Sequence, residues 1–279
     1  MTPGRQKRYN VHALNTAPAK RFDLAGKIVI LTGANGFLGR HYVDGYLSAG
    51  AKVAAFDTSV EGLKSLSRRH GRRLLTRAAD LADPRATRQA FDEALRRFGG
   101  LDAVHHNCGG KPDGFFDATE DYRLDAWRGV LAANVETAWL LTQCAIPHFK
   151  RRRRGVLLFT ASVYGLVGAD QRIYKGSFHL GGKINTPAAY AASKGAIVSL
   201  VRHLAAELGA WNIRVNALTP GGVSNGQNGV FQKKYSARVP LGRMARAEEM
   251  VGPAMFLLSD AAAYVTGHNL VVDGGLTAW

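Results

Sequence analysis

The sequence predicts an α/β fold, a doubly wound parallel sheet of about seven strands with helices on both faces. From residue 27 onward, short apolar or β-branched runs alternate with stretches of helical periodicity. The apolar runs are continuous, which is typical of parallel strands that are buried on both faces. The stretches between them are about a dozen residues or longer, enough for crossover helices.

The elements follow from these runs in chain order. We expect helices at 38–49, 60–69, 84–98, 124–149, 188–208 and 247–258, and the third of these begins with Pro84, which the first helical turn tolerates. The expected strands cover 27–32, 52–57, 74–79, 102–107, 155–162, 213–219 and 269–275. Because no linker, repeat or shift in composition interrupts them, we expect one catalytic domain at 23–279, preceded by an N-terminal arm at 1–22.

Composition favours a globular protein of a reducing compartment. The chain has 279 residues, of which 46% are hydrophobic and 21% charged, enough for a substantial core. No apolar run reaches the length of a membrane span, and the basic N-terminal stretch lacks the apolar segment of a secretory signal. Cys108 and Cys144 form no metal-binding or disulfide pattern. We therefore expect a cytoplasmic address, no membrane partner and no metal.

The chain is strongly basic, with 37 Lys and Arg against 21 Asp and Glu and a net charge of +16. The densest run, 150–154, follows the long helical pattern, so we expect a solvated helix C-terminus, which the helix dipole favours. No nucleic-acid-binding signature accompanies it, and we expect no nucleic-acid partner.

A glycine-rich turn, "ILTGANGFLG", joins the first strand to the first helix. Gly33 allows the tight turn, Gly36 lets the backbone approach a pyrophosphate, and Gly39 lets the helix pack on the strand. This context indicates a Rossmann-like dinucleotide site. Asp57 ends the second strand, where a carboxylate accepts the ribose hydroxyls and repels a 2′-phosphate. NAD is therefore favoured, while Lys64 and Arg68 leave NADP open.

Tyr190 and Lys194 stand four residues apart in "YAASK". Such a pair is common on a helix surface. An ammonium near a phenol, however, also lowers the phenol pKa toward the range useful for proton transfer.

With these pieces together, the chain resembles the short-chain dehydrogenase/reductase family from about residue 24 to the end. The order and spacing of the matching motifs are specific. They are "TGANGFLG" (32–39), "DLAD" (80–83), "HNCG" (106–109), "AANVET" (132–137), "TASVYG" (160–165), "YAASK" (190–194), "NALTPGGV" (216–223) and "YVTGHNLVVDGG" (264–275).

The resemblance implies a catalytic set and hydride transfer between a nicotinamide and a carbinol or carbonyl carbon. Tyr190 would donate or accept the proton, and Lys194 would lower its pKa and hold the nicotinamide ribose. Ser162 would hydrogen-bond the substrate oxygen. Asn134, within the long helix, would hold a water that relays protons to Lys194.

The resemblance also implies a set of cofactor contacts and a homo-oligomer, a tetramer or dimer packed through the helices at 124–149 and 188–208. The cofactor contacts would be Gly33, Asn35, Gly36, Phe37, Leu38, Asp57, Asp80, Leu81, Asn107, Cys108, Gly109, Tyr190, Lys194, Pro220, Gly221 and Val223.

Two motifs depart from the family pattern. The spacing TGxxGxxG is that of the longer epimerase and dehydratase branch, but the YAASK and VDGG contexts favour the single-domain dehydrogenases. "HNCG" replaces the usual NNAG, and we expect Cys108 to be a small packing residue, not a nucleophile.

The stretch between Ser162 and Tyr190 is also longer than is usual in the family, because it contains an insert at 168–188. Together with the lid expected at 221–243 it is basic and aromatic, which favours a polar, anionic, sugar-type substrate. The candidate substrate residues are Arg172, Tyr174, Asn225, Gln227 and Tyr235. These features also resemble a subgroup linked to sugar-acid and surface-glycan pathways.

Two other functions stay open at this point. A 3-oxoacyl-carrier-protein reductase would use the basic face to dock an acidic carrier, although the polar insert argues against a thin acyl channel. A cofactor-sensing binding protein would need no proton relay, so the intact set of catalytic candidates argues against it.

Overall fold

The computed structural model describes residues 18–279. Most of the expected N-terminal arm, residues 1–17, lies outside the described residues. The remainder of the arm, Pro18–Phe22, forms a single 3₁₀ turn, η1.

A single parallel sheet of seven strands forms the centre of the described chain, as expected. Its order is β3-β2-β1-β4-β5-β8-β9, and all neighbouring pairs are parallel. The strands are β1 (Ile28–Thr32), β2 (Lys52–Asp57), β3 (Leu74–Ala78), β4 (Ala103–His106), β5 (Gly155–Thr160), β8 (Ile213–Pro220) and β9 (Asn269–Val272).

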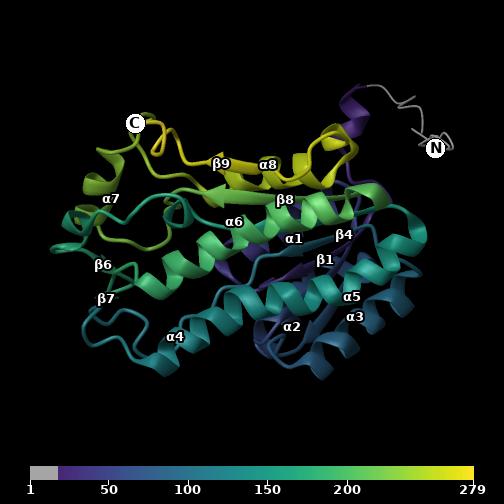
Figure 1. Ribbon diagram of the computed structural model, residues 1–279, viewed down its shortest axis with the longest axis horizontal. Helices are drawn as coiled ribbons and strands as arrows, with labels where there is room; N and C mark the ends of the chain where they lie inside the picture. The colour runs from purple at the N-terminus through teal and green to yellow at the C-terminus, as the bar shows by residue number, and fades with distance from the viewer. Residues whose placement is uncertain (1–17) are drawn as a thin grey trace, which may run out of the picture.

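Helices cover both faces of this sheet (Figure 1). One apolar cluster packs α1 (Phe37–Ser48), α2 (Val60–His70) and α8 (Val251–Leu258) on one face. A second cluster packs α3 (Pro84–Phe98), α5 (Thr137–Arg152) and α6 (Ala188–Leu208) on the other. Successive residues of β1 point to opposite clusters, since Ile30 belongs to the second and Leu31 to the first.

The helix expected at 124–149 is interrupted, which corrects the prediction. It consists of α4 (Leu124–Leu131), a π-helical turn η3 (Ala132–Glu136) and α5. An extra residue in such a turn shifts the backbone hydrogen bonds, and this often occurs at functional sites. Sequence periodicity does not reveal it, because one inserted residue hardly changes the apolar pattern.

The basic run does end α5, with Arg153 in the left-handed conformation at its C-cap (φ 49°). Its side chains are less free than expected. Lys150 and Arg153 lie over the Trp211 ring, and Arg152 and Arg154 both contact Asp102.

The insert and the lid form one cover. The insert contains η5 (Gln171–Tyr174) and a small hairpin of β6 (Phe178–His179) and β7 (Gly182–Lys183), and the lid contains α7 (Gly229–Ser236). Asn228 binds the insert three times, through bonds with the amide and carbonyl of Phe178 and with the Gly176 carbonyl. These bonds join the insert to the lid.

Among residues 18–279, no helix is long and apolar enough to cross a membrane. The same residues contain no group of three or more His, Cys, Asp or Glu side chains arranged to hold a metal ion.

Candidate active site

A cavity of about 630 Å³ lies where the parallel strands end. Gly33 follows β1, Asp57 ends β2, Asn107 follows β4, Ser162 lies just beyond β5, and Pro220 ends β8. Parallel α/β sheets bind ligands at this edge. The insert and the lid supply the rest of the lining.

The glycine turn forms a close cradle at one end of the pocket. Gly33 has φ +62°, and a Cβ there would lie 2.9 Å from the Asn107 carbonyl oxygen. A Cβ on Gly39 would lie 2.0 Å from the Gly33 oxygen. Only glycine fits at either position, and the backbone stays open at the N-terminus of α1, as a pyrophosphate requires.

Asp57 lies beside this cradle. Its carboxylate accepts the Asn35 N–H at 2.9 Å and the Ser59 N–H at 3.0 Å, so it is held in place while each oxygen retains a lone pair for a ribose hydroxyl. Lys64, which left NADP open, is paired with Glu61 at 2.7 Å.

A buried chain of hydrogen bonds supports the turn from behind. Thr160 Oγ1 donates to Asn107 Oδ1 at 3.0 Å, and Asn107 Nδ2 donates to the Gly33 carbonyl at 3.4 Å. Because the Thr160 hydrogen is committed, His105 Nε2 carries the hydrogen in its 2.9 Å bond to Thr160. His105 Nδ1 then accepts the Tyr46 hydroxyl at 2.8 Å. The hydrogen bonds run in one direction from α1 to the glycine turn and specify a neutral imidazole.

Tyr190, Lys194 and Ser162 meet at the centre of the pocket. Lys194 is buried, donates to the Thr160 carbonyl at 2.8 Å, and its Nζ lies 5.7 Å from the centre of the Tyr190 ring. Burial lowers the pKa of Lys194 to about 8. A pKa near neutrality lets this amine exchange protons readily.

The pKa of Tyr190 is raised, whereas a lowered pKa was expected. Burial raises it, a hydrogen bond with Ser162 lowers it, and Tyr174 raises it further. Lys194, which was expected to lower this pKa, is not among the groups that shift it, and desolvation of the buried phenolate is the largest effect. Ser162 is therefore the neighbour that favours the ionised tyrosine.

Asn134 lies in the π turn and is fully buried. Its amide donates to Ser193 Oγ at 2.8 Å and accepts the Gly110 N–H at 3.2 Å. Ser193 in turn donates to the Tyr190 carbonyl at 2.7 Å. The side chain thus connects the loop after β4 to the first turn of α6. The water relay stays a prediction, and it would use the backbone around Asn134, since both ends of the side chain are already bonded.

Cys108 also lines the pocket, and burial raises the pKa of its thiol to about 11. Since the thiolate is the nucleophilic form, this agrees with a packing residue.

The cofactor candidates gather in the pocket with two exceptions. Leu81 is a core residue that packs in the second apolar cluster, and Asp80 accepts the Ala82 N–H at 3.0 Å. Neither lines the cavity. The candidates that do are Gly33, Asn35, Gly36, Phe37, Leu38, Asp57, Asn107, Cys108, Gly109, Tyr190, Lys194, Pro220, Gly221 and Val223.

The substrate candidates divide in a similar way. Tyr174, Asn225, Gln227 and Tyr235 line the pocket. Arg172 does not, because its exposed guanidinium binds Asp170 at 2.8 Å.

The expected basic character of the cover does not extend to the pocket. Lys234 caps the carbonyls of Arg172 and Lys175, and Arg243 pairs with Glu249. A loop cation is easily satisfied by carbonyls and carboxylates of its own cover, and sequence cannot show which way it points. In the described part of the chain, Lys111 and Lys194 are the lysines that line the pocket, and no arginine does.

Sequence reasoning missed Lys111, Phe115 and Phe116 in the loop after β4. All three line the pocket, and the Lys111 ammonium lies 5.4 Å from the Phe116 ring centre. Phe115 packs edge-on against Tyr190 with ring centres 6.2 Å apart. The available signal was an aromatic pair closely following a glycine-rich strand end.

Comparisons with known proteins agree with this geometry. A family model described as enoyl-(acyl carrier protein) reductase matches residues 33–277. The chain is 34% identical to an inactive 2-(S)-hydroxypropyl-CoM dehydrogenase 2 of Xanthobacter autotrophicus, over 82% of this chain and 96% of that one. It is 32% identical to a D-threitol dehydrogenase of Mycolicibacterium smegmatis, over 92% and 95%.

A solved structure with the same fold is that of a gluconate 5-dehydrogenase from Burkholderia cenocepacia in complex with NADP and tartrate. It aligns with a TM-score of 0.83 and 26% identity, covering 94% of this chain and 100% of the other.

Proposed function

Because the chain belongs to the short-chain dehydrogenase/reductase family and is an NAD(P)-dependent oxidoreductase of CH–OH groups, we propose that it acts on a polyhydroxylated, sugar-type substrate. The observation that carries this proposal is the lining of the pocket beyond Tyr190. There the cover supplies uncharged polar side chains, namely Asn225 and the hydroxyls of Tyr174 and Thr186, which bond each other at 2.6 Å. Gln227 also lines the pocket, with its amide bonded to the backbone of Asn225 and Val223. Such groups match hydroxyls, which both donate and accept hydrogen bonds.

The residues at the centre of the pocket divide the chemistry. The Tyr190 hydroxyl exchanges a proton with the reacting oxygen of the substrate, and the Ser162 hydroxyl hydrogen-bonds the same oxygen and stabilises its developing charge. In this proposal Lys194, whose Nζ lies 5.7 Å from the centre of the Tyr190 ring, takes up or supplies the proton that Tyr190 exchanges through an intervening water or hydroxyl. When bound, the nicotinamide supplies the hydride transfer.

The described residues fit a dinucleotide, since the glycine cradle leaves its backbone open and a fixed carboxylate stands at the ribose position. NAD is the preferred cofactor in this proposal because Asp57 would repel a 2′-phosphate. The pairing of Lys64 with Glu61 supports the same choice, since it occupies a cation that would otherwise be available to that phosphate.

Recognition of a negatively charged substrate depends, in this proposal, on Lys111. In this proposal a substrate carboxylate, where present, meets Lys111 at the rim, while the hydroxyls meet the cover. The relatives named for threitol and gluconate represent the two cases, a neutral polyol and a sugar acid.

The test is oxidation of matched alditols and aldonates with NAD and NADP. Tyr190→Phe is expected to lower kcat roughly 10²- to 10⁴-fold, the usual contribution of a general acid or base, while NADH still binds. Lys111→Met is expected to raise KM for aldonates and leave alditols unchanged. Turnover of 3-oxoacyl thioesters alone would instead favour a carrier-protein reductase. Cofactor binding without turnover of any substrate class would favour a sensor.

Assembly as a dimer or tetramer stays a prediction. Trp139 on α5 and Leu124 on α4 are 45% and 60% exposed, which supports packing of these helices against another copy. Light scattering of wild type and of Trp139→Glu measures the oligomeric state.

A further inference from the structure

A second cavity, about 610 Å³, lies at the opposite edge of the sheet, where the strands begin. It is lined by η1, the loop from η1 to β1, the first residue of β1, the turn between α3 and β4, the last turns of α5, the residue before β5, and the 3₁₀ turn η8 (Asp260–Ala262). The active-site pocket shares no lining residue with it. The two cavities are therefore separate sites.

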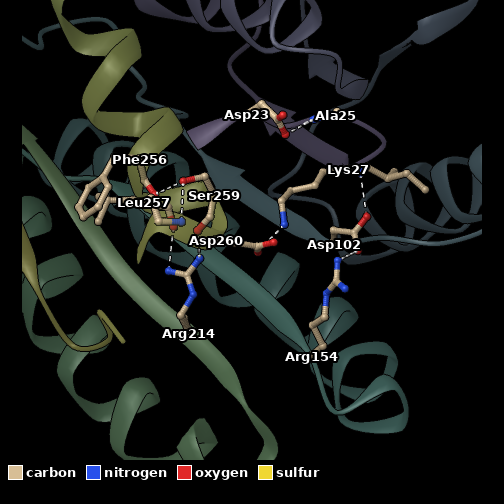
Figure 2. Close-up of polar contacts among 12 residues, drawn as sticks. Asp23, Ala25, Lys27, Asp102, Arg154, Arg214, Phe256, Leu257, Ser259 and Asp260 are labelled. Carbon is tan, nitrogen blue, oxygen red and sulfur yellow. Dashed lines mark hydrogen bonds and ion pairs between the residues drawn. The ribbon is translucent and has the colours of Figure 1, made fainter. Parts of the chain in front are cut away.

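Charged side chains dominate this cleft, and several are already arranged by ion pairs (Figure 2). Lys27 binds Asp260 at 2.7 Å. Asp102, a nearly buried carboxylate, accepts the Ile28 N–H at 2.9 Å and contacts Arg152 at 3.3 Å and Arg154 at 3.1 Å. These bonds hold the cationic groups in place at the wall of the cleft.

Hydrogen-bond donors outnumber the acceptors available to them. The lysines and arginines of the lining are Lys20, Lys27, Arg152 and Arg154, against the carboxylates Asp23, Asp102 and Asp260. One oxygen of Asp102 serves both arginines, and its other oxygen is bonded to the backbone of Ile28.

Several donors remain unused. Lys20 makes no hydrogen bond or ion pair within the described chain. Arg154 is bonded to Asp102 through one side-chain nitrogen, and its side chain is 52% exposed. His148 also lines the cleft, and its Nε2 is buried without a hydrogen-bond partner in residues 18–279.

We propose that this cleft binds a phosphate group. A phosphate offers several acceptor oxygens and a double negative charge, which suit converging lysine and arginine donors. Binding would also favour the protonated, donating form of His148. If the charges served only to join η8 and α5 to the sheet, the pairs of Lys27 with Asp260 and of Arg152 with Asp102 would suffice, and Lys20, which has no partner among residues 18–279, would have no role.

The experiment is calorimetric titration of the full chain with inorganic phosphate and, separately, with glycerol 3-phosphate, both in saturating NADH. The bound cofactor occupies the glycine cradle, which would otherwise bind phosphate as well. We expect one phosphate per chain in wild type. Lys20→Gln and Arg154→Gln are each expected to weaken binding about tenfold or more, as loss of a charge-assisted hydrogen bond does.

The control variant is Arg85→Gln, which removes an exposed cation of α3 outside the cleft and should bind phosphate like wild type. Lys20→Gln removes no contact of the described fold, and Asp102 keeps Arg152 and Ile28 in Arg154→Gln, so folding is preserved. Tighter binding of the ester indicates an organic phosphate as the natural ligand, and tighter binding of inorganic phosphate indicates the free ion. Absence of binding in wild type, or equal affinity in the two cleft variants and wild type, would overturn the proposal.

Discussion

Mild acid is expected to destabilise this protein through two buried histidines, His105 and His106 of β4. Burial lowers the pKa of each to about 3, and for His106 the nearby Lys194 adds to the effect. The ordinary value is about 6.5. The folded pKa thus lies below the unfolded one, so their stabilisation is complete above pH 6.5 and is lost as the pH falls from 6.5 toward 3.

The magnitude follows from the width of this window. Within this window the unfolded chain binds a proton at each histidine and the folded chain does not. The free energy of unfolding therefore falls by about 1.4 kcal/mol per pH unit for each histidine. Between pH 6.5 and 5, each lowers the free energy of unfolding by about 2 kcal/mol, or about 4 kcal/mol together. Such a loss is a large fraction of the stability of a typical domain.

The assay is urea unfolding followed by circular dichroism between pH 5 and 7.5. His105→Gln and His106→Gln keep a donor and an acceptor but do not titrate, so each should remove about half of this acid dependence. His203→Gln, on the exposed side of α6, is the control and should retain all of it. A wild-type midpoint that stays constant from pH 6.5 to 5, or an unchanged slope in both glutamine variants, would refute the reasoning.

Three further predictions concern the pocket. Gly39→Ala should abolish NADH binding or folding, since its Cβ would lie 2.0 Å from the Gly33 oxygen, and fluorescence titration with circular dichroism separates these results. Asp57→Ser should raise KM for NAD and lower it for NADP, because the carboxylate that repels the 2′-phosphate is gone; an unchanged ratio of kcat/KM would contradict this. Tyr235→Phe removes the 2.5 Å bond that its hydroxyl accepts from the Gly222 N–H, and should raise substrate KM with NADH affinity intact. It should also lower stability by about 1–2 kcal/mol, as for a buried donor left unpaired.

Part of the site could be predicted because it depends on local spacing. A strand followed by the glycine turn and a helix places Gly33, Gly36 and Gly39 together whatever the rest of the chain does. Helical geometry likewise puts Tyr190 and Lys194 on one face. The alternation of apolar runs and helical patterns also predicted the parallel sheet, because burial on both faces requires continuous apolar strands.

Other features depend on which residues far apart in the chain come into contact. Arg172 is not among the residues that line the pocket, because its guanidinium pairs with Asp170, and Lys234 of the lid is bonded to two carbonyls of the insert. The hydrogen bond between Tyr46 and His105 joins residues 59 positions apart in the chain, and no sequence pattern indicates it.

The sequence by itself determined the fold class, the family and the positions of the candidate catalytic and cofactor motifs, because each motif depends on chain geometry over one or two turns. Tertiary structure alone decided which charges face a cavity, how burial changes the pKa values of Tyr190 and Lys194, and where the second cleft lies. The physical reason is that desolvation and ion pairing depend on every neighbour a side chain meets, and only packing brings those neighbours together.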